Sequence, residues 1–116
     1  MKKQMLGAKG EALACAFLQA KGYKIIERNY RSPHGEIDII AWHDRTLVFV
    51  EVKTRTSLTF GHPEESITAL KKQHLRKSAL EYVRSKALSY HEFRFDVIGI
   101  YCGSTPPDIN HIEAAF

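Results

Sequence analysis

The chain has 116 residues, of which 44% are hydrophobic and 26% are charged, a composition typical of a single globular domain spanning 1–116. Its net charge of +4 favours polyanionic partners, and no apolar run approaches the roughly 20 residues that span a bilayer. Two distant cysteines, Cys15 and Cys102, exclude a disulfide framework and favour a reducing, cytoplasmic setting.

The first half of the chain predicts one helix followed by three strands. Apolar residues spaced at i, i+4, i+7 and i+8 form one stripe over 4–21, and Gly22 ends that helix. Alternating side chains then predict a strand over 23–30. Two nearly continuous hydrophobic runs predict strands over 36–42 and 47–54, joined by a polar turn.

The second half predicts a helix, a strand and a short C-terminal extension. Pro63 suits a first helical position, and the two glutamates after it suit the helix dipole, so a helix is expected over 63–87. A fourth strand is expected over 93–101. Residues 103–116 are expected to form a turn and then an edge strand over 111–116. This order predicts an α/β fold with a mixed sheet flanked by helices.

Charged residues interrupt the two hydrophobic strands at the end away from their turn. If the turn centres on Asp44 and Arg45, then Glu51 faces Asp38 and Lys53 faces Glu36. The aliphatic residues would share the opposite face, namely Ile37, Ile39, Ala41, Val48, Val50 and Val52. Opposed carboxylates destabilise a strand pair, so this arrangement needs compensation.

A divalent cation would compensate the opposed carboxylates. Mg²⁺ binds carboxylate oxygens, and Mn²⁺ suits the same ligands. Lys53 lies on the same face as Glu51, so its ammonium could reach water or phosphate, which is the arrangement for metal-assisted phosphodiester hydrolysis. The alternative is that Asp38, Glu51 and Lys53 form salt bridges on a solvated face. The hydrophobic character of both strands favours a site.

Asp38, followed after twelve residues by Glu51-Val52-Lys53, resembles the metal site of the PD-(D/E)XK nuclease superfamily. Several longer segments are similar to the YraN-like family of small bacterial proteins: GAKGEALACAFLQAKGYKIIERNYR, GEIDIIAW, LVFVEVKTR, ESITALKKQHLRKSALEYV and FRFDVIGI. The similarity extends from Gly7 to about Tyr101. It implies a restriction-endonuclease-like core of helix, three strands, helix and strand.

The resemblance also implies roles for individual residues. Asp38 and Glu51 match the two metal-binding acids, and Val52 would contribute its backbone carbonyl. Lys53 matches the lysine that positions the attacking water. One position departs from the pattern, because Ile37 stands where the superfamily's nominal proline precedes the aspartate.

Two helical positions are implied by the same resemblance. Glu11 matches an acidic residue that joins the site in relatives that include archaeal Holliday-junction resolvases. Gly7 and Ala14 flank it on the first helix, and such small residues allow close approach to a sheet. Lys71 matches a basic position that borders the site. Without the resemblance, an exposed helix position explains Glu11 equally well.

Basic residues near the acidic centre predict contacts with a phosphate backbone. The candidates are Arg28, Arg31, Arg55, Lys71, Lys72 and Arg76. For those on the second helix, a solvated helix face is an equal alternative.

The sequence therefore predicts a metal-dependent nuclease that uses Mg²⁺ or Mn²⁺, with DNA as the expected substrate. The alternatives are a nucleic-acid-binding or accessory module in DNA repair or recombination with little catalysis, and a structural protein with a salt-bridged sheet face. A domain of this size offers limited surface for a duplex, which leaves room for a homodimer or a partner protein.

Overall fold

A computed structural model describes residues 3–88 and 92–116, with side chains from residue 6 onward. Its elements, in chain order, are α1 (Lys3–Ala20), β1 (Lys24–Ser32), β2 (Gly35–His43), β3 (Thr46–Arg55), a 3₁₀ turn η1 (Pro63–Ser66), α2 (Ala69–Lys86), β4 (Glu92–Tyr101) and β5 (Asp108–Ile112). No helix in these ranges is long and apolar enough to cross a membrane.

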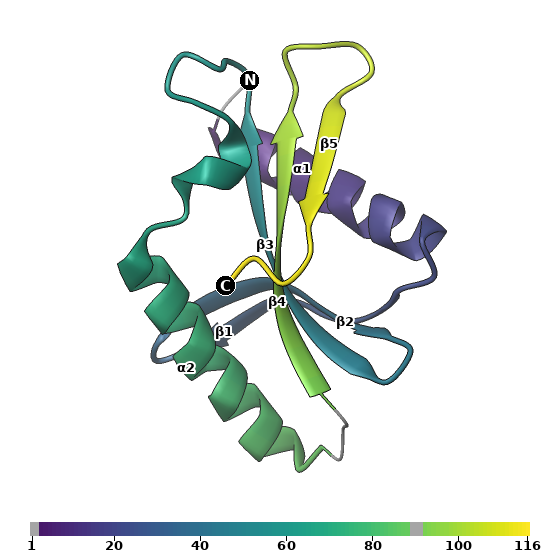
Figure 1. Cartoon of the computed structure of the whole chain (residues 1–116), viewed down its shortest axis with the longest axis vertical. Helices are drawn as coiled ribbons and strands as arrows, with labels where there is room; N and C mark the ends of the chain where they lie inside the picture. The colour runs from purple at the N-terminus through teal and green to yellow at the C-terminus, as the bar shows by residue number, and fades with distance from the viewer. Residues whose placement is uncertain (1–2, 89–91) are drawn as a thin grey trace.

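The strands form one mixed sheet in the order β1-β2-β3-β4-β5 (Figure 1). The first three strands form an antiparallel meander. β4 is parallel to β3, and the chain between these two strands passes through η1 and α2. β5 pairs antiparallel with β4 at the edge. This arrangement confirms the predicted mixed α/β architecture, and it is compatible with a restriction-endonuclease-like core.

The two long helices lie on opposite faces of the sheet, and each covers its own hydrophobic core. Ala14 and Leu18 of α1 pack against the face that carries Val48 and Val50. Leu75 and Tyr82 of α2 pack against the other face, which carries Phe49. Because both faces are covered, the central strands are hydrophobic on both sides, which explains their continuous apolar runs.

The predicted register of the β2–β3 hairpin is confirmed near its turn. Trp42 faces Leu47 and Ile40 faces Phe49, as expected from a turn at Asp44 and Arg45. The pairing ends at Ile39 and Val50, however, so the predicted ladder partners beyond that point are not formed among the described pairs.

The prediction that Ile37 shares a face with Ile39 is wrong. Ile37 belongs to the core under α2, whereas Ile39 belongs to the core under α1. Opposite these residues, Arg28 pairs with Ile39 and Tyr30 pairs with Ile37, and the residue between them, Asn29, has a left-handed backbone with φ of 52°. β1 therefore has an irregular backbone beside the stretch of β2 in which the side chains change faces.

The predicted helix over 63–87 is two elements, because the chain becomes extended at Ile67 (φ −85°, ψ 112°). Thr68 then begins α2, and its Oγ1 accepts a hydrogen bond from the Lys71 backbone N–H at 3.1 Å. η1 lies against β4, where a Cβ added at Gly99 would come within 2.9 Å of the Glu64 nitrogen. The edge strand exists, at Asp108–Ile112 instead of 111–116.

Candidate functional site

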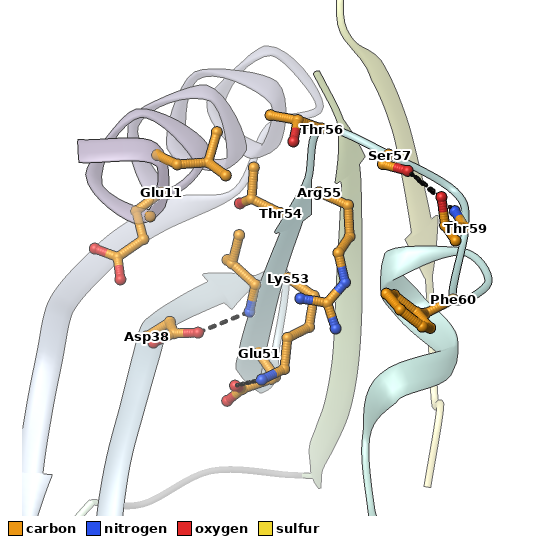
Figure 2. Close-up of a pocket in the computed structure, with 13 residues that line it drawn as sticks. Glu11, Asp38, Glu51, Lys53, Thr54, Arg55, Thr56, Ser57, Thr59 and Phe60 are labelled. Atoms are coloured by element: carbon orange, nitrogen blue, oxygen red, sulfur yellow. Dashed lines mark hydrogen bonds and ion pairs between the residues drawn. The ribbon is translucent and has the colours of Figure 1, made fainter. Parts of the chain in front are cut away.

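A cavity of about 740 Å³ opens between α1, the ends of β2 and β3, and the loop that follows β3 (Figure 2). Three carboxylates line it, from Glu11 on α1, Asp38 on β2 and Glu51 on β3. Lys53 and Arg55 of β3 line it as well. The structure therefore brings all four predicted catalytic residues to one cavity, from three separate elements.

Asp38 lies where β2 and β3 separate. Beyond the pair formed by Ile39 and Val50, Asp38 Oδ2 accepts a hydrogen bond from the Val52 backbone N–H at 2.8 Å. The carboxylate thereby replaces the carbonyl that would accept this bond in a continued ladder. This contact fixes the orientation of Asp38 and joins the two strands where their backbone ladder has ended.

Glu11 reaches the cavity because α1 lies close to β3 at the preceding residue, Gly10. A Cβ added at Gly10 would overlap the Thr54 side chain of β3, so only glycine allows the helix to lie this close. The sequence prediction attributed this approach to Gly7 and Ala14. The structure assigns it to Gly10, the residue directly before Glu11.

Glu36 is a residue of this region that the predicted site omitted. One carboxylate oxygen from each of Glu11, Glu36 and Asp38 lies within 4.8 Å of those of the other two. In the amide orientation that its neighbours favour, Asn29 Nδ2 donates to Glu36 Oε1 at 3.1 Å and to both Glu11 oxygens at 3.0 and 3.1 Å. Glu36 precedes Asp38 by two residues, a spacing that could have identified it.

Glu51 is the most enclosed acid of the cavity, with a side chain only 5% exposed. Its Oε1 lies 3.8 Å from the ammonium of Lys53 and 3.8 Å from that of Lys71. Its Oε2 is buried and has no hydrogen-bond partner among the described residues. A buried carboxylate oxygen without a donor is costly, so this atom is suited to a ligand.

The electrostatics of the cavity disfavour two free carboxylates. Burial, followed by repulsion from Glu51, raises the pKa of Asp38 to about 7, although the Val52 N–H opposes the shift. Burial also raises the pKa of Glu51, against the attraction of Lys71 and then Lys53. Burial and the repulsion between carboxylates therefore disfavour the ionised forms, and a bound cation would favour the ionised form of both acids.

Two of the predicted basic residues lie at the acidic centre. Arg55 lines the cavity, and the Lys71 ammonium is 3.8 Å from Glu51 Oε1. Arg31 is exposed and forms an ion pair with Glu36 at 3.5 Å. Arg28 is exposed on β1 and pairs through its backbone with Ile39, one residue from Asp38.

The other two predicted basic residues, Lys72 and Arg76, contact the C-terminal aromatic ring instead of the acidic cavity. The Lys72 ammonium lies 5.7 Å from the centre of the Phe116 ring, and the Arg76 guanidinium lies 5.2 Å from it. Neither residue lines the acidic cavity. Their cation–π contacts hold the C-terminal aromatic ring against α2.

Comparison with known proteins places the chain among bacterial relatives. Residues 10–100 match the family described as uncharacterised protein family UPF0102. A UPF0102 protein of Syntrophomonas wolfei is 46% identical over 96% of both chains, and one of Caldicellulosiruptor saccharolyticus is 46% identical over 100% of both. One of Rhodococcus opacus is 46% identical over 96% of this chain and 95% of that protein.

Proposed function

We propose that this chain, which belongs to the uncharacterised protein family UPF0102, is a metal-dependent nuclease acting on nucleic acid. The family name states no activity, and the proposal rests on the residues of the cavity. The single observation that carries the proposal is the buried Glu51 Oε2, which has no partner among the described residues and lies in a cavity shared with Asp38 and Glu11. An orphaned oxygen beside further carboxylates is the donor set of a hard divalent cation.

The donor types suit Mg²⁺ or Mn²⁺. Among the described residues, the carboxylate oxygens within 4.8 Å of one another are those of Glu11, Glu36 and Asp38, and Glu51 lies outside this cluster. Asp38 and Glu51 would hold the ion with the Val52 carbonyl, and Glu11 would complete the set from the helix side. Glu36 lies close enough to Glu11 and Asp38 to join them. When bound, the cation would act as a Lewis acid that polarises the phosphodiester and offsets charge developing on it.

The neighbouring lysines supply the chemistry that the chain itself performs. The Lys53 ammonium is held beside Glu51, where it can orient a water molecule or donate to a phosphate oxygen. Lys71 presents a second ammonium to the same Glu51 oxygen from α2. Because these two groups come from rigid elements, their positions relative to the acids are set before a substrate arrives.

The order of elements supports the same proposal. The order of a helix, three antiparallel strands, a helix and a parallel strand is compatible with the core of the PD-(D/E)XK superfamily, whose motif the sequence resembles at Asp38, Glu51 and Lys53. Arg55 at the cavity suits a phosphate backbone, and we take DNA as the first substrate to test.

Metal binding tests the site directly, and isothermal titration calorimetry with Mg²⁺ and Mn²⁺ measures it. We expect saturable binding to the wild-type protein and a loss of affinity of at least about tenfold in Asp38→Asn and Glu51→Gln. Asp108→Asn removes an exposed acid on β5 and serves as the matched control. Unchanged affinity in both cavity variants would refute the metal site.

Cleavage tests the activity. Single-stranded, flap and four-way-junction DNA are incubated with the protein and Mg²⁺, and products are resolved on denaturing gels. We expect Lys53→Ala to lower the cleavage rate by about 10²-fold, because a positioned proton-transfer group contributes this much or more. Binding of these substrates without any cleavage would instead support an accessory module.

A further inference from the structure

As a refinement that rests on the proposed function, we propose that Phe60 is a stacking platform for an unpaired base, so that the substrate is single-stranded or branched nucleic acid. Phe60 is 95% exposed, more than any other exposed large hydrophobic residue of the described chain. A single exposed apolar side chain is ordinary on a protein surface, so the location of Phe60 is what matters. The ring lines the cavity that holds Glu11, Asp38 and Glu51.

The loop that carries Phe60 is built to present it. The Gly61 backbone N–H donates to the Leu58 carbonyl at 3.0 Å, and Gly61 has a φ of 93°, which closes a tight turn. Thr59 N–H donates to Ser57 Oγ at 3.2 Å, and the two hydroxyls lie 2.6 Å apart. Pro63 is buried directly after the turn. These contacts hold the backbone while the ring stays in solvent.

The surroundings of the ring suit a nucleotide. Figure 2 shows Phe60 on the loop side of the cavity, Glu11 on the helix side, and Arg55 extending into the space between them. A base lying on the ring would place its phosphate near the Arg55 guanidinium and direct the adjoining strand toward the carboxylates. Single-strand-binding proteins combine aromatic platforms and basic grooves in this way.

The ring selects for unpaired nucleotides because of what a duplex hides. In a double helix, neighbouring base pairs already cover both faces of each base. Only a base at an end, in a flap, in a junction or in a single strand has a free face for Phe60. The phosphate contacts of Arg55 and Lys71 are available to either kind of substrate. Loss of the ring should therefore weaken the binding of single strands much more than that of duplexes, in which only the terminal bases have a free face.

Fluorescence anisotropy measures this difference with a labelled single-stranded oligonucleotide and a duplex carrying the same label. Ca²⁺ replaces Mg²⁺ as the oxygen-binding cation, and a gel verifies that the oligonucleotide stays intact. We expect Phe60→Ala to raise the Kd for the single strand about fivefold or more and to leave the duplex Kd within about twofold. Phe60→Trp should retain the single-strand affinity. Leu80→Ala removes another exposed side chain, on α2 outside the cavity, and should change neither Kd.

Several outcomes would overturn the role of Phe60. These are equal losses for single strand and duplex, an unchanged Kd in Phe60→Ala, and no single-strand affinity in the wild-type protein. Sedimentation that changes from dimer to monomer in Phe60→Ala would also overturn it, because the ring would then be a contact between copies. If any of these outcomes is found while the protein still binds Mg²⁺ and cleaves DNA, only the role of Phe60 is wrong, and the proposed nuclease function stands. If the protein neither binds metal nor cleaves DNA, but Phe60→Ala still weakens single-strand binding selectively, the nuclease proposal is wrong and the role of Phe60 in binding stands.

Discussion

Two regions of the sheet bury carboxylates, and the regions differ in whether the chain supplies hydrogen-bond donors to the buried oxygens. Asp96 of β4 is fully buried, and both its oxygens have donors. Arg94 Nε lies 2.8 Å from Oδ1, His111 Nε2 lies 2.7 Å from Oδ2, and the Ala114 backbone N–H donates to Oδ1 at 3.0 Å. In the acidic cavity, by contrast, Glu51 leaves one buried oxygen without a partner.

The pKa values of these acids shift in opposite directions. Burial would raise the pKa of Asp96, but hydrogen bonds from His111, Arg94 and the Ala114 backbone outweigh burial and lower it. For Asp38, burial and the nearby Glu51 raise the pKa to about 7. A buried acid in a strand is therefore not diagnostic of a site. Asp96 has donors from the chain on both oxygens, whereas Glu51 keeps one oxygen for a ligand beside the other acids of the cavity.

The largest expected effect is on the structural side of this comparison. Asp96→Ala should lower the free energy of unfolding by about 3–5 kcal/mol, because it leaves the Arg94 charge without its main partner and removes the acceptor of His111 and of the Ala114 N–H. Urea denaturation followed by circular dichroism measures the loss. Asp108→Ala, at an exposed position of β5, should stay within about 0.5 kcal/mol. A loss below about 1 kcal/mol for Asp96→Ala would contradict a structural role.

A smaller effect is expected from a ligand on the acidic cavity. Mg²⁺ at about 100 times its Kd should raise the free energy of unfolding of the wild-type protein by about 2.7 kcal/mol, because it binds only the folded chain. Glu51→Gln should lose about half or more of this stabilisation, because a Kd raised tenfold leaves about 1.4 kcal/mol at the same Mg²⁺ concentration, whereas Asp108→Asn should keep it. Thermal unfolding with and without Mg²⁺ measures both. Equal stabilisation of Glu51→Gln and wild type would place the ion elsewhere.

The sequence predicted those parts of the fold that depend on local periodicity. Apolar patterning located the first helix, most of α2 and the first four strands, and the turn at Asp44 and Arg45 fixed the register of Ile40 with Phe49. Local capping went unrecognised: the Thr68 hydroxyl begins α2 after an extended residue, so η1 and α2 do not form one helix. The boundary of β5 was also displaced, since the pattern there is short and half exposed.

Part of the candidate site was likewise predicted from the sequence, and part depends on contacts between distant elements. Glu11, Asp38, Glu51 and Lys53 were predicted to share a site, and they line one cavity. Glu36 was visible as a charge in β2, but its proximity to Glu11 depends on the separation of β2 from β3 and on the close approach of α1 at Gly10. Such distances arise from contacts between elements far apart in the chain, which periodicity does not encode.

The buried network around Asp96 went unrecognised for a related reason. Arg94 lies two residues before Asp96 and therefore on the same face of a strand, a local pattern that could have indicated an ion pair. His111 and Ala114, which complete the set of donors, come from the C-terminal segment, whose position against β4 no local pattern predicts. By sequence alone, Asp38 and Asp96 are both acids flanked by hydrophobic residues within a strand.

The smallest expected effect concerns how the stability contributed by Asp38 and by Asp96 depends on pH. Asp38→Asn keeps an oxygen for the Val52 N–H and removes the charge. The folded pKa of Asp38, about 7, exceeds its ordinary 3.8, so the stability it contributes is present below about pH 4 and is lost as the pH rises to about 7. In metal-free buffer at pH 8, Asp38→Asn should therefore be more stable than wild type by about 0.5–2 kcal/mol.

That gain should disappear near pH 4, where wild-type Asp38 is protonated in the folded chain, and urea denaturation at both pH values measures it. Asp96 sets the opposite expectation. Its lowered pKa means that its stabilisation is present above the ordinary value and is lost as the pH falls through the folded value. A gain in Asp38→Asn that does not change with pH would mean that burial and Glu51 do not act on its ionisation. The two acids would then differ only in their hydrogen bonds, and the cavity would lose its electrostatic reason to bind a cation.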